Sequence, residues 1–261
     1  MQLNAKMFLI VCPMLFIAGL VDAIGGGGGL ISLPAYLFAG LPIHYSIATN
    51  KLSSTCGTSL ATFRFIKHKL VDYKLAIPAV ICAILGSSLG AQLSLRMSDR
   101  VMRNVMFIVL PVAAFFVLNK DLFKDRGGEV EENRRTFIVA AAAAFIIGVY
   151  DGFYGPGTGT FLIIAFTVFA KMGITSANAQ TKVINLTTNI TSLTIFLLHG
   201  QVIIPLGIAA ALCNMAGNYI GAGLAMNKGS KIVRPVILLD LGLLLFRSSS
   251  AVSWPSSWSE P

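Results

Sequence analysis

The sequence predicts an all-α membrane protein of about eight membrane segments, and three observations lead to this prediction. Hydrophobic residues make up 55% of the 261 residues and charged residues only 12%, against about 25% charged residues in typical soluble domains. The apolar residues form long runs, and most of the chain can be aligned with itself. Because lipid offers the backbone no hydrogen bonds, runs of about 20 apolar residues are expected to be helices.

The apolar segments run at 7–24, 30–39, 52–67, 75–95, 101–118, 137–154, 160–170, 183–198, 202–226 and 232–246. Glycines interrupt two pairs of them, at Gly25–Gly29 and within the stretch Gly155–Gly159. Counting each interrupted pair as one broken unit gives eight membrane segments. The N-terminal run resembles a signal peptide, but a related run recurs in mid-chain, so we expect it to be a membrane span.

An internal repeat divides the chain into two four-segment modules. An offset of 131 residues places 48–103 on 179–234 and aligns Lys51 with Lys182; upstream, after a small gap, Asp22 falls on Asp151. The predicted organisation is therefore a first module at 1–118, a charged connecting loop at 119–136 and a second module at 137–246. Residues 247–261, rich in Ser and Pro, are expected to be a disordered or vector-derived tail.

The orientation of the two modules depends on whether the broken units cross the membrane. The connection at 64–74 is basic and its counterpart at 199–203 has no charge, which favours inverted modules. The basic residues at 96–103 are matched by basic residues at 228–234, which favours parallel modules. We expect inversion, with the central loop in the cytoplasm.

Each glycine cluster is expected to break a helix within the membrane. Non-helical backbone is tolerated there only where it is buried in protein or lines a cavity. Two breaks at matching places in two halves are typical of a transporter binding site. The half-helix after each break offers free N–H groups and a positive dipole end, which suit an anion. Close helix packing through small residues is the alternative interpretation.

Lys51 and Lys182 are each expected at the start of an apolar span. They either snorkel to the membrane interface or lie beside the glycine breaks and help to hold an anion, together with polar neighbours. Asp22 and Asp151 precede the breaks inside apolar sequence, where a carboxylate is costly and has a partner or a function. Each could pair with a lysine, cap the following half-helix or carry a coupling proton, and Asn at either position is expected to retain substrate binding.

Other features argue against several classes of function. The net charge of +9 comes from residues in short connections, which is typical of cytoplasmic loops and not of nucleic-acid binding. The three His and four Cys have no metal-type spacing, so no metal or cofactor is expected. No serine, zinc or paired-aspartate motif indicates an enzyme. The polar residues at 185–192 form a stripe that is expected to line the pathway, and His68 and His199 are expected to be structural.

Two segments resemble the TauE/SafE family of sulfite exporters, the TSUP transporters. They are GLVDAIGGGGGLISLPAYLFAGLPIHYSIATNKLSS in the first module and GVYDGFYGPGTGTFLIIAFTVFAKMGITSANAQTKVINL in the second. The resemblance covers residues 7–246 and implies an inner-membrane, multi-pass carrier of small anions such as sulfite or sulfoacetate. The family pattern and the polar neighbours give the expected substrate-binding residues, which are Gly25, Gly26, Gly27, Gly28, Gly29, Thr49, Asn50, Lys51, Gly155, Gly157, Gly159, Gln180, Thr181 and Lys182.

The expected function is therefore secondary transport of a small sulfur-containing oxyanion or organosulfonate by alternating access. The expected partners are the anion and the lipid bilayer; protons are one option for the coupling ion, and a homodimer is one option for assembly. Two alternatives stay open: a non-transporting assembly factor of another membrane complex, and an intramembrane enzyme. The identity of the anion, the direction of transport and the coupling ion are also open at this point.

Overall fold

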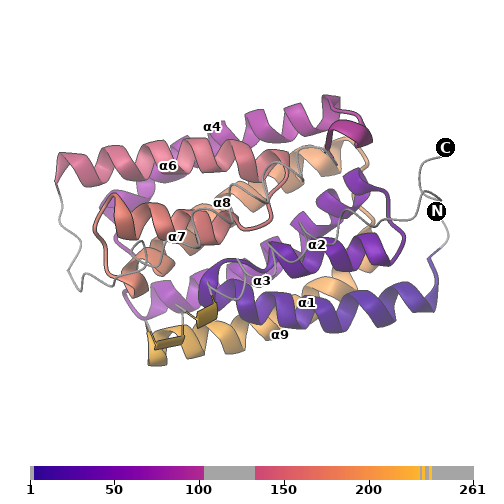
Figure 1. Ribbon diagram of the computed structural model, residues 1–261, viewed down its shortest axis with the longest axis horizontal. Coiled ribbons are helices and arrows are strands. Elements are labelled where there is room, and N and C mark those ends of the chain that lie inside the picture. The colour runs from indigo at the N-terminus through magenta and orange to yellow at the C-terminus, as the bar shows by residue number, and fades with distance from the viewer. Residues whose placement is uncertain (1–2, 103–132, 230, 233–234, 237–261) are drawn as a thin grey trace.

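A computed structural model describes residues 3–102, 133–229, 231–232 and 235–236, and within these ranges the chain is helical and contains no strand. Figure 1 shows the arrangement of its main helices. In chain order they are α1 (Ala5–Gly25), α2 (Gly29–Phe38), α3 (Ile43–Lys67), α4 (Tyr73–Arg96), α6 (Arg134–Phe153), α7 (Thr158–Val168), α8 (Ile174–Leu198) and α9 (Ile204–Lys228). The predicted segments at 101–118 and 232–246, the loop at 119–136 and the tail lie wholly or largely outside the described residues.

Four of these helices, α1, α4, α6 and α9, are long and apolar enough to cross a membrane. α1 packs along α9, and α4 packs along α6. Between these pairs lie α3 and α8, which contact each other and are 25 residues long each. α3 and α8 carry many polar side chains, and most of these are buried against protein. Most polar side chains of α3 and α8 thus face protein instead of lipid.

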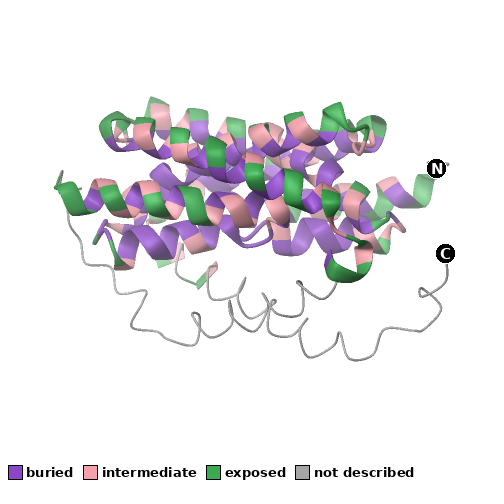
Figure 2. Ribbon diagram, turned by 90° about the horizontal axis from the view of Figure 1, so that it is seen from above, coloured by how far each residue is buried: buried purple, intermediate pink, exposed green. Residues whose placement is uncertain are grey.

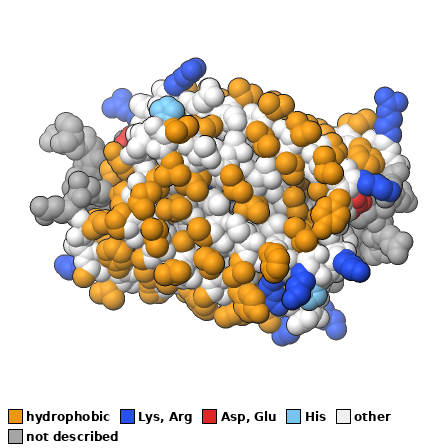
Figure 3. All heavy atoms as spheres, turned by 180° about the vertical axis from the view of Figure 1, so that it is seen from behind, with side chains coloured by type: hydrophobic (Ala, Val, Ile, Leu, Met, Phe, Trp, Pro, Cys, Tyr) orange, Lys and Arg blue, Asp and Glu red, His pale blue; other side chains and the backbone are white. Residues whose placement is uncertain are grey.

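The outer surface is apolar where a bilayer would surround it. On α4 the exposed side chains Ile77, Ile81, Leu85 and Leu89 recur every four residues, which places them on one face of the helix. Figure 2 shows exposed residues on the outside of the bundle and buried ones within. Figure 3 shows hydrophobic side chains over the middle of the molecule and Lys and Arg towards its two ends. This is the surface of a multi-pass membrane protein.

Glycines allow the outer helices to approach their partners closely. A Cβ atom on Gly90 would lie 2.0 Å from the Val149 carbonyl oxygen, and one on Gly217 would lie 2.0 Å from the Phe16 carbonyl oxygen. The glycines at 86, 90, 217 and 221 thus allow the helices of each pair to pack closely. Contacts advance in the same direction along both helices of each pair, so α4 runs parallel to α6 and α1 parallel to α9.

Each glycine break turns the chain back on itself. After α1, Gly26 adopts a left-handed φ of 82° and α2 begins at Gly29. Tyr36 and Leu41, at the end of α2, share a buried cluster with Met7 and Val11, at the start of α1. α1 and α2 therefore form a hairpin whose outer ends lie together.

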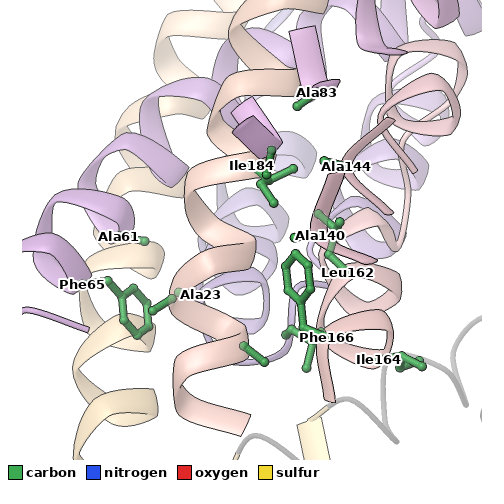
Figure 4. Close-up of a cluster of buried hydrophobic side chains, with 14 of the residues drawn as sticks. Ala23, Ala61, Phe65, Ala83, Ala140, Ala144, Leu162, Ile164, Phe166 and Ile184 are labelled. Atoms are coloured by element: carbon green, nitrogen blue, oxygen red, sulfur yellow. The ribbon is translucent and has the colours of Figure 1, made fainter. Parts of the chain in front are cut away.

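The second module has a matching hairpin. The glycines Gly155 and Gly157 have φ of 98° and 84° between α6 and α7. Figure 4 shows Phe166, near the end of α7, beside Ala140, near the start of α6. In Figure 1, α1 begins at the right end of the molecule and α6 at the left end, so the two hairpins enter from opposite ends.

Two helices begin earlier than hydropathy predicts. α3 starts at Ile43 and α8 at Ile174, whereas the expected spans started at 52 and 183. The first turns of both helices contain polar residues such as Ser46, Asn178 and Gln180, which are buried in the protein. Because these side chains face protein instead of lipid, low hydropathy there does not mark a loop.

Candidate functional site

The two glycine breaks face each other in the protein interior, as the sequence predicts. A Cβ atom on Gly26 would lie 2.3 Å from the carbonyl carbon of Gly159, and one on Gly159 would lie 2.5 Å from the Cα of Gly26. The Thr160 hydroxyl donates a hydrogen bond to the Gly25 carbonyl oxygen at 2.8 Å. The non-helical stretches are shorter than the glycine clusters, because Gly25, Gly29 and Gly159 belong to helices.

Two lysine–aspartate ion pairs cross from one module to the other beside these breaks. Lys51 of α3 pairs with Asp151 of α6, with Nζ and Oδ2 separated by 2.7 Å. Lys182 of α8 pairs with Asp22 of α1 at 2.9 Å. The exposed fractions of the Lys51, Asp151, Lys182 and Asp22 side chains are 3%, 3%, 0% and 13%. Burial of this kind is tolerated because each charge has an opposite partner.

The lysines therefore do not snorkel to the membrane interface. Each lies about two helical turns inside its helix, since α3 begins at Ile43 and α8 at Ile174. The prediction that Lys51 and Lys182 lie at the start of a span is wrong, because the polar turns before them are helical as well. The prediction that a cation lies close to the breaks is confirmed, because the Lys51 Nζ would lie 3.3 Å from a Cβ atom added to Gly155.

A small cavity lies between the ion pairs and the breaks, and both modules contribute to its wall. Its volume is about 20 Å³, which is room for a water molecule and not for an organic anion. The cavity is closed to anions in this conformation. Its lining residues are Asp22, Gly26, Gly29, Asn50, Lys51, Ser54, Asp151, Gly155, Thr158, Gly159, Asn185 and Asn189.

The lining combines one ammonium group, the carboxylates of Asp22 and Asp151, and several neutral polar side chains. The Lys51 Nζ donates a hydrogen bond to Asn189 Oδ1 at 3.0 Å as well as to Asp151. Asn189 Nδ2 donates to Asn185 Oδ1 at 3.2 Å. Within the described part of the chain, the Oδ1 atom of Asn50 is buried and has no hydrogen-bond partner. Ammonium, amide and hydroxyl groups are the donors that an oxyanion requires.

The structure brings together six of the fourteen expected substrate-binding residues. Gly26, Gly29, Asn50, Lys51, Gly155 and Gly159 line the cavity. Thr49 and Gln180 have structural bonds instead: the Thr49 hydroxyl accepts from the Ile203 N–H at 3.1 Å, and Gln180 Nε2 donates to the Asp72 carbonyl at 2.9 Å. The remaining expected residues, which do not line this cavity, are Gly25, Gly27, Gly28, Gly157, Thr181 and Lys182.

The aspartates pair with lysines and do not cap the half-helices. The N-caps of α2 and α7 are Gly28 and Gly157, and neither helix has a side-chain cap. Asp151 Oδ1 instead accepts a hydrogen bond from the Thr158 hydroxyl at 2.7 Å. The capping role predicted for Asp22 and Asp151 is therefore wrong, because the opposite module supplies each carboxylate with an ammonium partner.

Sequence reasoning missed Ser54 and Thr158, which line the cavity, and placed Asn185 and Asn189 only in a polar stripe. Helical spacing could have found three of these residues, Ser54, Asn185 and Asn189, the last of which follows Asn185 by four. Ser54 follows Lys51 by three residues, and Asn185 follows Lys182 by three; residues at this spacing share a helix face. The outer part of the stripe is structural, since the hydroxyls of Thr187 and Thr191 bond back to their own helix.

The predicted structural role of the two histidines agrees with their contacts. His68 Nδ1 lies 2.8 Å from the Arg64 carbonyl oxygen, and His199 Nδ1 lies 2.8 Å from the Ile195 carbonyl oxygen. Each histidine is the C-cap of its helix, α3 or α8. Both lie at helix ends and are not among the residues lining the cavity.

The sequence model of the family described as Sulfite exporter TauE/SafE matches residues 11–247. The chain belongs to the TauE/SafE family. It is 34% identical over 235 residues to a "Probable membrane transporter protein ORF9" of Sinorhizobium sp, with 89% of this chain and 87% of the relative covered. It is 34% identical over 226 residues to the "Probable membrane transporter protein YfcA" of Escherichia coli K12, covering 85% and 82%.

A relative from Haemophilus influenzae, also a "Probable membrane transporter protein", is 29% identical over 260 residues, with 99% of both chains covered. No solved structure matches the chain. The comparisons cover both modules, the two glycine breaks and all four residues of the crossed ion pairs, since these lie within residues 11–247.

Proposed function

We propose that this TauE/SafE protein is a secondary transporter of a small oxyanion, such as sulfite or a short organosulfonate. The observation that carries this proposal is the buried cavity between the two modules, where the Lys51 ammonium and the amides of Asn50, Asn185 and Asn189 converge. A cluster of this chemistry inside a membrane protein is costly unless it serves a substrate or ion pathway. The relatives' names describe transporters as well.

The charge and size of the cavity favour alternating access with a coupled proton. The two ion pairs have no net charge, so an anion entering alone would leave a buried site with a net negative charge. Protonation of Asp151 as the anion replaces it at Lys51 would restore neutrality. Because the closed cavity has about 20 Å³, entry also requires the modules to move apart.

We further propose that the chain has eight membrane segments in two inverted modules. Supporting this, each module has one hairpin, α1–α2 or α6–α7, and the first helix of each module packs on the fourth of the other. Asn4 and Asn133 also cap α1 and α6 in the same way, accepting from the Met7 and Thr136 N–H groups at 3.0 and 2.9 Å. Inverted repeats of this kind place the binding site at the interface of the two halves.

The distribution of charge indicates the orientation in an inner membrane. One end of the molecule holds the α3–α4 connection, the starts of α6 and α8 and the end of α9. Among the described residues, the cations at this end are Arg64, Lys67, Lys69, Lys74, Arg134, Arg135, Lys171, Lys228 and Lys231. Those at the other end are Lys6, Arg96 and Arg100. By the positive-inside rule the first end faces the cytoplasm and the start of α1 faces outward.

Purified protein in sealed liposomes tests the function. A transporter accumulates labelled sulfite or sulfoacetate when an inward proton gradient is applied, whereas an assembly factor or an intramembrane enzyme does not. Lys51→Ala should remain folded and lose at least tenfold in anion affinity, because it removes the charged donor from the cavity. Lys67→Ala is the matched control, since Lys67 lies exposed at the end of the same helix. An unchanged dissociation constant in Lys51→Ala would contradict the proposed site.

A further inference from the structure

The two lysines of the crossed ion pairs bond to different kinds of partner. The Lys51 Nζ donates to two side-chain oxygens, Asp151 Oδ2 and Asn189 Oδ1, at 2.7 and 3.0 Å. The Lys182 Nζ donates to Asp22 Oδ2 at 2.9 Å and also to the backbone carbonyl of Asp22. Lys51 lines the cavity and Lys182 does not. Corresponding positions therefore hold one lysine bound to side chains alone and one lysine bound to a helix end.

The end of α1 is held by side chains of the second module at every one of its last four carbonyls. A helix normally leaves its last carbonyls without an intrahelical partner, although in α1 the Asp22 carbonyl also accepts from the Gly26 N–H at 2.8 Å. Here Lys182 bonds to the carbonyl of Asp22, and Asn178 Nδ2 donates to the carbonyls of Ala23 and Ile24 at 3.1 Å each. The Thr160 hydroxyl donates to the Gly25 carbonyl at 2.8 Å. The first break is thus clamped onto α7 and α8.

The second break is bonded by side chains of its own module: the Tyr150 hydroxyl donates to the Pro156 carbonyl oxygen at 2.5 Å, and the Thr158 hydroxyl donates to the Gly155 carbonyl oxygen at 2.7 Å. The end of α6 lacks a counterpart of Asn178 from the other module. At the offset of 131 residues, Ile47 occupies on α3 the position that Asn178 occupies on α8. Ile47 is buried, with 1% of its surface exposed, and its side chain has no N–H or O–H group to donate to a carbonyl. The backbone of the second break also has more space: a Cβ on Gly157 would meet its nearest atom at 3.7 Å, against 2.3 Å for Gly26.

We infer that the first break stays in place as one side of the cavity, and that the second break, with its Asp151–Lys51 pair, is the part that moves. Asn178, Thr160 and Lys182 act as positioning residues: they hold the end of α1 and do not contact the ligand. One consequence is that the anion enters from the side of the second break. This consequence rests on the proposed function. The asymmetry itself does not depend on any ligand.

Hydrogen–deuterium exchange of the full chain in lipid nanodiscs, followed by mass spectrometry, tests the inference. Backbone amides at 24–30 should exchange at least tenfold more slowly than those at 153–159, because local opening of the first break must disrupt the clamp. Asn178→Ile, which installs the residue found at the corresponding position, should accelerate exchange at 24–30 at least tenfold and leave 153–159 unchanged. Asn214→Ala is the matched control, because Asn214 bonds to the Leu15 carbonyl in the middle of α1.

A second variant covers the case in which Asn178→Ile does not fold. Thr160→Val keeps the side-chain shape and removes only the hydroxyl that bonds to Gly25, and it should accelerate exchange at 24–30 alone. Equal exchange of the two breaks in the wild-type chain would overturn the inference, and so would unchanged exchange at 24–30 in the folded variants. Since no anion is added, these outcomes are separate from failure of anion transport in liposomes, which bears on the proposed function alone.

Discussion

The α1–α2 break and the α6–α7 break occupy matching places, but side chains of the other module bond to the first, whereas side chains of its own module bond to the second. Three side chains of the second module bond to the end of α1, whereas Ile47 replaces the asparagine at the corresponding place beside α6. At this matched position the two halves of the chain therefore make different contacts: Asn178 bonds to carbonyls of α1, and Ile47 has no N–H or O–H group to donate. Matching sequence positions therefore predict the location of a group better than its function.

The largest expected effect is a difference in labelling between the starts of α1 and α6, because the two hairpins enter the protein from opposite ends. In a cysteine-free background, Lys6→Cys and Arg135→Cys place thiols at exposed, corresponding positions near the starts of α1 and α6. A membrane-impermeant maleimide should label Lys6→Cys in intact cells and Arg135→Cys only after permeabilisation, because inverted modules expose these sites on opposite sides. Labelling of both residues from the same side would contradict inversion.

A second comparison uses the glycines with left-handed φ in the two breaks. Gly26→Ala and Gly157→Ala introduce the same strain, since φ is 82° and 84°. Only Gly26→Ala also collides with backbone, because its Cβ would lie 2.3 Å from Gly159. Gly26→Ala should yield no folded protein. Gly157→Ala should fold with a loss of about 1–2 kcal/mol, seen as a lower melting temperature.

Size-exclusion chromatography and thermal melting in detergent distinguish these two variants. Gly40→Ala is a useful control, because Gly40 has a φ of 88° and no atom within 4 Å of an added Cβ. It should resemble Gly157→Ala. Normal folding of Gly26→Ala would show that the two breaks do not contact each other as closely as described.

The smallest effects are expected from the aspartates. Asp151→Asn removes the carboxylate that competes with an anion for Lys51, so anion affinity should rise roughly threefold to tenfold while proton-driven accumulation is lost. Asp22→Asn should change affinity by less than about threefold, because Lys182 keeps its bond to the Asp22 carbonyl. Calorimetric titration with sulfite measures both. Lost binding in either folded variant would refute these roles.

Hydropathy and glycine clustering were sufficient to predict the helical class and the two breaks. They placed the starts of α3 and α8 too late, because hydropathy measures contact with lipid and these turns contact protein. One constraint was enough to predict that the two breaks face each other: irregular backbone within a membrane must be covered by protein.

The crossing of the ion pairs could not be predicted from the sequence. Pattern alone does not say whether Lys51 pairs with the aspartate of its own module or with Asp151, because this depends on how the hairpins dock. The roles of Thr49 and Gln180 were missed for a related reason. Both are polar neighbours of the lysines, yet their partners, Ile203 and Asp72, lie in connections at the ends of other helices.

The pairing of α1 with α9 also bears on how the chain is made. Among the described helices α1 is made first, but the helix that packs along it, α9, begins only at Ile204. At about 5–20 residues per second, α1 waits roughly 10–40 seconds for that partner. For most of this interval Asp22 also lacks its counterion, because Lys182 follows it by 160 residues, and a carboxylate within the membrane is costly until its partner arrives.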